Sequence, residues 1–218
     1  MRKYQYSTKE FNFRGIVEEY LKNTDLENLH RTDRFEKKLT SAAGDYGDQK
    51  QELHRRFYNK MDEDPSFICF YKKFVGEVVQ PLFEDETYYQ EFPTFRVHQP
   101  DNVCVFDWHR DMDFGHSKHE INIYLPITKT YGSNTIWSES QEGKKDYSPM
   151  ELEYGEFNVW DGAKLFHGNK NNDTNQTRVS FDFRILPVKK YDESNAKNCR
   201  TLTKGTSFAL GGYFQELG

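Results

Sequence analysis

Two residues that can bind a metal, a histidine and an aspartate, stand two positions apart in the stretch 108–111, WHRD. In an extended segment His109 and Asp111 project to the same side, so an imidazole nitrogen and a carboxylate oxygen face one point. A histidine from a distant strand would complete a three-ligand face, and His167, at the end of the run KLFH, is the best candidate. Two histidines and one carboxylate leave positions of an octahedral metal open, which suits non-haem Fe(II) that binds a cosubstrate together with O₂.

An HxD pair alone is weak evidence, because this spacing occurs by chance in many chains. The stretch RVS that follows His167, with Arg178 and Ser180, makes a metal site with a bound keto acid more plausible. On a strand Arg178 and Ser180 face the same side. A guanidinium group binds a carboxylate through two parallel hydrogen bonds, and a hydroxyl group adds a third. These two residues are therefore predicted to anchor the far carboxylate of a dicarboxylic keto acid whose other end chelates the metal.

The order HxD, distal His, RxS resembles the Fe(II)/2-oxoglutarate-dependent dioxygenases. Longer strings resemble one branch of them, the StrG-type proteins of streptomycin biosynthesis: FPTFRVHQPDN, WHRDMDFGH, EINIYLPIT, NTIWSES, LEYGEFNVWDG, LFHGNKNN and TRVSFDFRILP. The resemblance covers about residues 90–190 and the final GGYF. It implies a double-stranded β-helix with Fe(II) at one open end.

The resemblance also assigns roles to residues of this chain. His109, Asp111 and His167 would be the metal ligands and catalytic residues, and Arg178, helped by Ser180, would hold 2-oxoglutarate. The implied reaction converts 2-oxoglutarate and O₂ to succinate and CO₂ while a C–H bond of a small metabolite is oxidised. Related halogenases have a small residue in place of the carboxylate, so the presence of Asp111 favours hydroxylation or desaturation. The substrate would belong to secondary metabolism, or be an amino acid, sugar or cyclitol.

Further polar and aromatic residues could line the same site. Asn122 and Tyr124 alternate on one predicted strand and either face the cosubstrate or form a polar part of the core. Arg96 and His98 share a face and either contact substrate or form a polar pair near the barrel mouth. Trp137 either walls the substrate pocket or is an ordinary buried tryptophan.

Arg184 has the same strand parity as Arg178, about 20 Å further along. A structural ion pair with Asp182 is the favoured interpretation, and a contact with an acidic substrate is the alternative. His116 and His119 follow the HxD pair and are expected to line or cap its loop rather than bind the metal.

Composition narrows the class of protein. The 218 residues carry a net charge of -5, so no basic excess is present to neutralise nucleic-acid phosphates. Aromatic residues make up 16% of the chain, which suits a packed core rich in sheet. Three separated cysteines argue against disulfides, and neither a signal peptide nor a membrane span is visible. We expect a cytoplasmic protein with a small-molecule substrate and without a nucleic-acid or membrane partner; its oligomeric state stays open.

The hydrophobic pattern predicts a single mainly β domain with flanking helices. Residues 1–90 read as a helical segment, with a helix capped by Ser7 or Thr8, a short helix at 51–60 and one opened by Asp64-Pro65 and stopped near Pro81. Residues 191–218 form a tail whose aromatic end docks on the core. The core, 91–190, contains eight short strands, as in a jelly-roll or cupin-like double-stranded β-helix. These strands are expected at 94–98, 103–108, 120–125, 134–139, 151–154, 157–160, 164–167 and 178–186.

Two other functions fit part of this pattern. A cupin-like isomerase or hydrolase would use a different metal in a similar barrel, but it would leave Arg178 without an obvious role. A non-catalytic jelly-roll binding protein would not need an intact set of metal ligands. The oxygenase is therefore the leading hypothesis.

Overall fold

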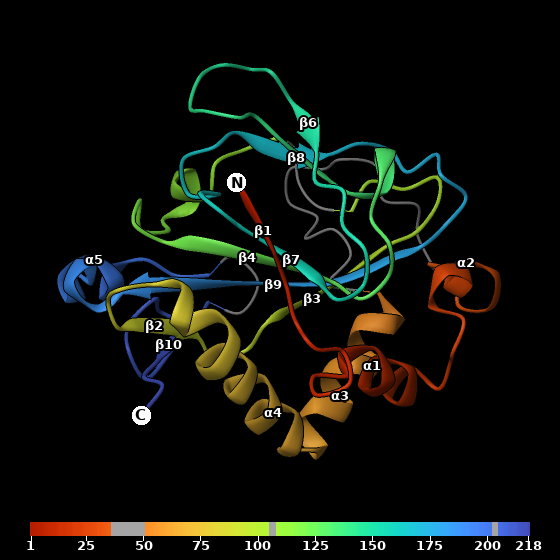
Figure 1. Cartoon of the computed structure of the whole chain (residues 1–218), viewed down its shortest axis with the longest axis horizontal. Coiled ribbons are helices and arrows are strands. Elements are labelled where there is room, and N and C mark those ends of the chain that lie inside the picture. The colour runs from red at the N-terminus through yellow and green to blue at the C-terminus, as the bar shows by residue number, and fades with distance from the viewer. Residues whose placement is uncertain (36–50, 105–107, 202–204) are drawn as a thin grey trace.

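The chain folds as a mainly antiparallel sheet with several helices, in a computed structural model that describes residues 1–35, 51–104, 108–201 and 205–218 (Figure 1). The strands are β1 Arg2–Gln5, β2 Thr87–Gln90, β3 Thr94–His98, β4 Ile121–Pro126, β5 Ile136–Ser138, β6 Ser148–Pro149, β7 Glu156–Trp160, β8 His167–Asn169, β9 Arg178–Pro187 and β10 Phe214–Gln215. The helices are α1 Phe13–Leu21, α2 Leu29–Thr32, α3 Glu52–Glu63, α4 Ser66–Phe74 and α5 Glu193–Asn198.

Two sheets of unequal size make up the β structure. The larger has the order β1-β7-β4-β9-β2-β10. Strand β2 pairs with residues 185–187 of β9, and β3 pairs with residues 178–182 of the same strand. The smaller has the order β6-β5-β8. In Figure 1 the larger sheet lies between the small sheet above it and helices α1, α3 and α4 below it.

Strand β9 carries the hydrophobic core on one face and polar residues on the other. Val179, Phe181, Phe183 and Ile185 all belong to the cluster that includes the helices. The even-numbered residues from Arg178 to Arg184 face the opposite way, because successive side chains of a strand alternate. Residues paired with this face on the neighbouring strands extend it. Arg96 of β3 lies opposite Ser180, and on β4 Asn122 lies opposite Arg184 and Tyr124 opposite Asp182.

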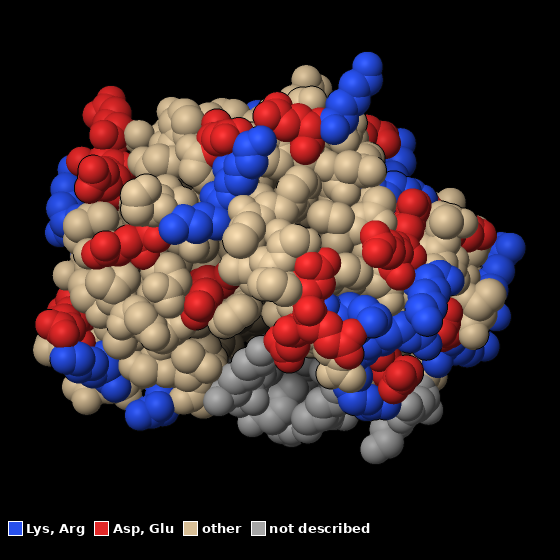
Figure 2. Space-filling model, turned by 90° about the horizontal axis from the view of Figure 1, so that it is seen from below, with Lys and Arg blue, Asp and Glu red and all other residues tan. Residues whose placement is uncertain are grey.

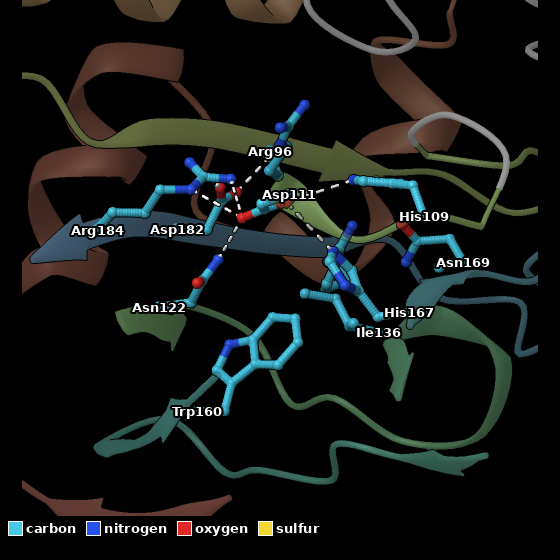
Figure 3. Close-up of a pocket in the computed structure, with 12 residues that line it drawn as sticks. Arg96, His109, Asp111, Asn122, Ile136, Trp160, His167, Asn169, Asp182 and Arg184 are labelled. Atoms are coloured by element: carbon cyan, nitrogen blue, oxygen red, sulfur yellow. Dashed lines mark hydrogen bonds and ion pairs between the residues drawn. The ribbon is translucent and has the colours of Figure 1, made fainter. Parts of the chain in front are cut away.

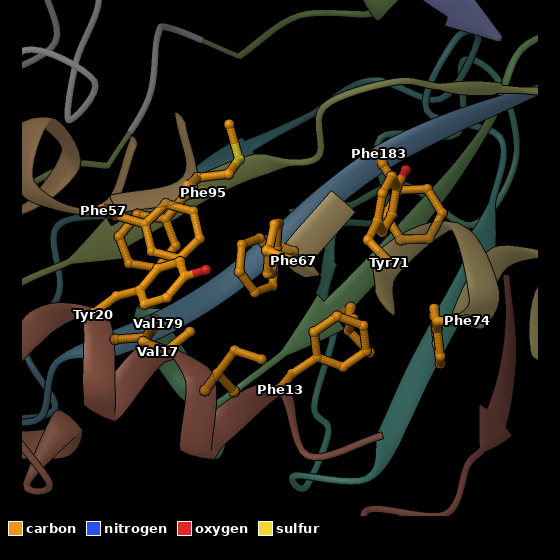
Figure 4. Close-up of a cluster of buried hydrophobic side chains, with 14 of the residues drawn as sticks. Phe13, Val17, Tyr20, Phe57, Phe67, Tyr71, Phe74, Phe95, Val179 and Phe183 are labelled. Carbon is orange, nitrogen blue, oxygen red and sulfur yellow. The ribbon is translucent and has the colours of Figure 1, made fainter. Parts of the chain in front are cut away.

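Aromatic side chains fill the space between the sheet and the helices (Figure 4). Phe57 of α3 stacks on Phe95 of β3, with ring centroids 4.1 Å apart, and both rings contact Phe181 of β9. Tyr71 of α4 packs edge-on against Phe183. Such contacts add to the gain from burying large apolar surfaces, and they fix the helices to one face of β9.

The helix boundaries follow local capping signals. The N-cap of α4 is Pro65, one residue after the predicted Asp64, and the Asp64 carboxylate accepts a hydrogen bond from the Ser66 amide at 3.0 Å. A π-helical turn and a 3-10 turn extend this helix to Leu82. For α1 the predicted cap was wrong: the Asn12 side chain, rather than Ser7 or Thr8, accepts the hydrogen bond from the Gly15 amide.

The strand predictions were right where alternation is strong and wrong where segments are short. Strands β3, β4, β5, β7 and β9 lie where the sequence predicted them. The predicted strand 151–154 is reduced to one bridge between Thr130 and Leu152, and 164–167 becomes a strand only from His167. Of the predicted strand 103–108, residues 105–107, like the loop 41–50, fall outside the described residues, and residues 103, 104 and 108 do not belong to a strand. The sequence did not reveal β1, β2, β6 or β10, and β1 and β2 lie within the segment read as helical.

The carboxyl-terminal segment returns to the larger sheet. Phe214 and Gln215 pair with β2, and the Glu91 amide donates to the Tyr213 carbonyl at 2.9 Å. Among the described residues, no helix combines the length and apolar character needed to cross a bilayer. On the face seen from below the helices, acidic and basic side chains are interspersed rather than segregated (Figure 2).

Candidate metal centre

His109 and His167 are held together by their own main chains. The amide of each donates to the carbonyl of the other, at 2.8 and 2.9 Å, in an isolated antiparallel bridge at the start of β8. The two imidazole rings lie on the same side of this bridge, with centroids 4.6 Å apart. The pairing of two chain segments 58 residues apart thus presents both histidines to one point.

Asp111 lies against these two rings, at the start of a 3-10 turn, Asp111–Phe114. Its amide donates to the Gly162 carbonyl at 3.1 Å. Its Oδ1 atom is 3.4 Å from His109 Nε2 and 3.6 Å from His167 Nε2. One ligand atom from each of the three residues lies within 4.8 Å of the others, so the predicted triad forms a group that could hold a metal ion (Figure 3).

The protonation of His167 suits a metal ligand. Its Nδ1 atom lies 2.8 Å from the Leu165 carbonyl, so Nδ1 carries the donated proton and the Nε2 lone pair faces Asp111. Burial lowers the pKa of His167 to about 4, and this effect outweighs the negative charge of Asp111, which would raise the pKa. The imidazole is therefore neutral near neutral pH, which is the form that binds metals.

The second oxygen of Asp111 is held by two other residues. Arg184 donates to Oδ2 from Nε at 2.9 Å and from Nη2 at 2.7 Å, and Asn122 donates from Nδ2 at 2.8 Å. Burial alone would raise the pKa of Asp111, but the charge of Arg184 holds it well below its usual value. The carboxylate is thus ionised and fixed in orientation, with Oδ1 turned towards the histidines.

Two glycines give the site the room it needs. A Cβ atom on Gly162 would lie 2.7 Å from Nδ2 of Asn122, and one on Gly168 would lie 2.7 Å from the ring of Trp108. Real Cβ atoms essentially never approach other atoms this closely. The absence of a side chain at these positions therefore lets Asn122 reach Asp111 and lets Trp108 cover the strand that carries His167.

The triad opens into a pocket of about 520 Å³, part of which is open solvent. Arg178 also lines this pocket and is 1% exposed. Its Nη1 donates to the Tyr124 hydroxyl at 3.2 Å, and its Nη2 lies 2.8 Å from the sulfur of Cys104. Ser180, two residues further along the same face of β9, is not part of the pocket lining; its buried hydroxyl has no hydrogen-bond partner among the described residues. A buried cation in the pocket, with an unsatisfied hydroxyl group on the same face of its strand, is a suitable place for a ligand carboxylate.

For several residues the sequence left two roles open, and the structure shows which contacts they make. Asn122 contacts Asp111, whereas Tyr124 contacts Arg178. His98 does not line the pocket, and its ring nitrogens lie 3.2 and 2.7 Å from the carbonyls of Asn134 and Asn102. Its structural interpretation therefore fits better than substrate contact.

Trp137 likewise lies outside the pocket lining, and its indole donates to the Gly132 carbonyl at 2.8 Å. The adjacent residue on β5, Ile136, lines the pocket, because neighbouring residues of a strand face opposite ways. Sequence reasoning also missed Trp160, which pairs in register with Asn122 on β4. The alternation along β7 indicated which residues share a face with Trp160, but the sequence could not show the register with β4 that brings this tryptophan to the site.

The predicted ion pair of Arg184 has a different main partner. Asp182 approaches Arg184 only to 4.0 Å and instead accepts a hydrogen bond from Arg96 at 3.0 Å. Arg96 and Asp182 both line the pocket. His116 Nδ1 lies 2.7 Å from the buried Glu120 carboxylate, which keeps this histidine outside the triad.

The solved structures to which this chain shows some similarity have low sequence identity to it. They include the non-haem monooxygenase ThoJ in its nickel complex, with 13% identity, a TM-score of 0.47, and coverage of 84% of this chain and 71% of that one. The α-ketoglutarate-dependent epimerase SnoN of nogalamycin biosynthesis has 11% identity, a TM-score of 0.47, and coverage of 94% and 89%. EvdO2 from Micromonospora carbonacea var. aurantiaca, complexed with 2-oxoglutarate, has 12% identity, a TM-score of 0.43, and coverage of 74% and 79%.

A full-length relative is known from sequence. No protein-family model matches the chain. The streptomycin biosynthesis protein StrG of Streptomyces griseus is 38% identical over 214 residues, which cover 98% of this chain and 96% of StrG. With that identity over nearly the full length of both proteins, this chain belongs to the StrG family.

Proposed function

We propose that this protein is an Fe(II)/2-oxoglutarate-dependent oxygenase that hydroxylates or desaturates a small metabolite. The observation that carries the proposal is one pocket that contains both a His-Asp-His group and a buried arginine. The group offers ligands to the metal, and the arginine offers a binding site for a carboxylate. A cupin-like isomerase or hydrolase would need the metal ligands but not Arg178.

The residues present fit a divalent metal. Nε2 of His109, Nε2 of His167 and Oδ1 of Asp111 are the atoms that would bind it. Two imidazoles and one carboxylate are the ligand set of non-haem Fe(II) oxygenases, and the metal would supply the activation of O₂. Asp111 is already ionised and His167 already neutral near neutral pH, so binding would not require proton loss from either.

The residues present also fit a dicarboxylic keto acid. Arg178 would bind its distal carboxylate, and the Ser180 hydroxyl, buried without a partner among the described residues, would donate a further hydrogen bond. The Tyr124 hydroxyl, 3.2 Å from the guanidinium, would keep Arg178 directed along the pocket. The keto end would then lie towards the triad, and the metabolite would bind in the remaining space beside Ile136 and Trp160.

The same proposal includes the architecture around the site. The small sheet β6-β5-β8 and the polar face of the larger sheet would be the two walls of a double-stranded β-helix. His167 is on the small sheet and Arg178 on the larger one, so the pocket is lined by both.

A spectroscopic titration tests the proposal. Anaerobic protein with Fe(II) and 2-oxoglutarate should develop a visible metal-to-ligand charge-transfer band. The band should be lost in His167→Ala and should need more 2-oxoglutarate in Arg178→Ala. Arg56→Ala is the matched control, because Arg56 binds Asp33 and the Leu21 carbonyl outside the pocket. Absence of the band and of 2-oxoglutarate binding in the wild-type protein would refute the proposal.

The reaction itself is tested by its products. A panel of amino acids, sugars and cyclitols should include a compound that increases succinate release, and mass spectrometry should show that it gains one oxygen or loses two hydrogens. Asp111→Gly should abolish this oxidation even if some iron is still bound. Turnover of a substrate without consumption of 2-oxoglutarate would favour an isomerase or hydrolase instead.

A further inference from the structure

Arg184 contacts the candidate metal centre although it belongs to none of the motifs that define the centre. Only 12% of its side chain is exposed. Two of its nitrogens donate to the same oxygen of Asp111, Oδ2, at 2.9 and 2.7 Å (Figure 3). An arginine this close to a metal ligand is unexpected on electrostatic grounds, because its charge repels the metal. Its geometry must therefore be considered separately from its charge.

The two oxygens of Asp111 have different surroundings. Oδ2 accepts from Arg184 and from Asn122, whereas Oδ1 faces the Nε2 atoms of His109 and His167. A carboxylate with one oxygen occupied in this way cannot rotate to offer both oxygens to a metal. We propose that Arg184 is a positioning residue that holds Asp111 as a ligand through Oδ1 alone, and that the carboxyl-terminal Tyr213 holds Arg184 in place.

The support for Arg184 comes from the carboxyl-terminal segment. Its Nη1 donates to the Tyr213 hydroxyl at 3.1 Å, and that hydroxyl donates to Gln90 Oε1 at 2.7 Å. The same Gln90 oxygen accepts from the Arg184 amide at 3.2 Å. Three donor groups of the guanidinium are thus directed by named partners, so the fork has one orientation. Tyr213 acts on the metal ligand through this chain of contacts without touching it.

Charge and geometry predict opposite effects when Arg184 is removed. Asp111, Glu120 and Asp182 lie 2.7, 3.8 and 4.0 Å from its nitrogens, so a neutral replacement would leave their charges free to attract a cation. Lysine keeps the positive charge but lacks the planar fork that binds two ways. Arg184→Lys therefore isolates the positioning effect, whereas Arg184→Gln would combine the two.

Titration with Co(II) alone tests the proposal without catalysis. The loss of a partner that orients a metal ligand typically weakens metal binding about 10- to 100-fold, and this loss is expected for Arg184→Lys. The ligand-field absorption of Co(II) should also change, because Oδ2, then held by Asn122 alone, is less restrained from becoming a second ligand. Tyr213→Phe should weaken binding in the same direction by a smaller factor. Arg14→Lys is the control: it alters an arginine that binds Glu27 and Glu18 away from the pocket, and it should lower the melting temperature but leave Co(II) binding unchanged.

The outcomes separate this inference from the proposed function, on whose metal-binding part it rests. No Co(II) binding by the wild-type protein would refute the metal site itself. Wild-type binding together with an Arg184→Lys affinity within about twofold of wild type would refute only the positioning role. If Arg184→Lys fails to fold, Tyr213→Phe decides, since an unchanged affinity and an unchanged Co(II) spectrum in that variant would overturn the proposal.

Discussion

Gly162→Ala should weaken metal binding by displacing Asn122. The new methyl group would lie 2.7 Å from both Cγ and Nδ2 of Asn122, whereas ordinary contacts between such atoms are about 3.5–4.0 Å. The amide group must therefore retreat by about 1 Å. Its hydrogen bond to Asp111 Oδ2, now 2.8 Å, would then exceed the limit of a normal bond.

The size of the effect follows from the bond that is lost. A hydrogen bond to a charged group contributes about 1.5–3 kcal/mol, and Arg184 still holds the same oxygen. We therefore expect the affinity for Co(II) to fall about tenfold, which corresponds to about 1.4 kcal/mol. The melting temperature should fall by only about 2–4 °C, as for a loss of about 1 kcal/mol, because the end of the Asn122 side chain can move.

A double-mutant cycle checks the mechanism. Asn122→Ala alone should weaken Co(II) binding to a similar degree. The Gly162→Ala/Asn122→Ala variant should bind no more weakly than Asn122→Ala, because both changes remove the same hydrogen bond to Asp111. Gly76→Ala is the control, since its methyl would meet only Leu217, at an ordinary 3.9 Å. A double variant that combines both losses in full would show that Gly162→Ala does not act through Asn122, and the reasoning would be refuted.

Three further predictions concern stability. Phe57→Ala should lower the free energy of unfolding in urea by about 3–5 kcal/mol, because this fully buried ring stacks on Phe95; a loss below about 1 kcal/mol would contradict that packing. Asp64→Ala should lower the melting temperature, since it removes the acceptor of the Ser66 amide at the start of α4 and the partner of the Tyr20 hydroxyl, and thermal melts should show no comparable loss when an exposed acidic residue of α3 is changed to alanine. Burial opposes the ionisation of Glu27, but the hydrogen bond from its arginine partner outweighs it and lowers its pKa below the usual 4.5. The ionised Glu27 stabilises the fold fully above about pH 4.5, and this stabilisation is lost as the pH falls through the lowered pKa of Glu27 in the folded protein. The difference in urea stability between wild type and Glu27→Gln should therefore shrink below about pH 4.5, and a difference that grows there would contradict the reasoning.

The parts of the site that the sequence revealed are those with local signals. His109 and Asp111 share a short stretch, and Arg178 lies on a strand with clear alternation, so residue type and parity were sufficient to select them. His167 was selected because the metal needed another ligand of its kind. These inferences required no knowledge of which strands are neighbours.

The parts that were missed depend on register between distant strands. Arg184 was placed on the right face of β9, but its contact with Asp111 arises because the turn after His109 folds back over that end of the strand. On a strand as short as β5, parity could not distinguish Ile136 from Trp137. The edge strands β1 and β10 were missed because two to four residues are too few to show an alternating pattern.

The two faces of β9 have a consequence for local motion. Its amides are hydrogen-bonded to strands on both sides, and Phe181 and Phe183 anchor it to the helices. Regions with this many buried contacts exchange their amide hydrogens only when the whole domain unfolds. Arg178 and Arg184 should therefore keep their positions in every partly open state that the native protein visits, and the slowest-exchanging segment of the molecule should be the one that also orients the metal ligand.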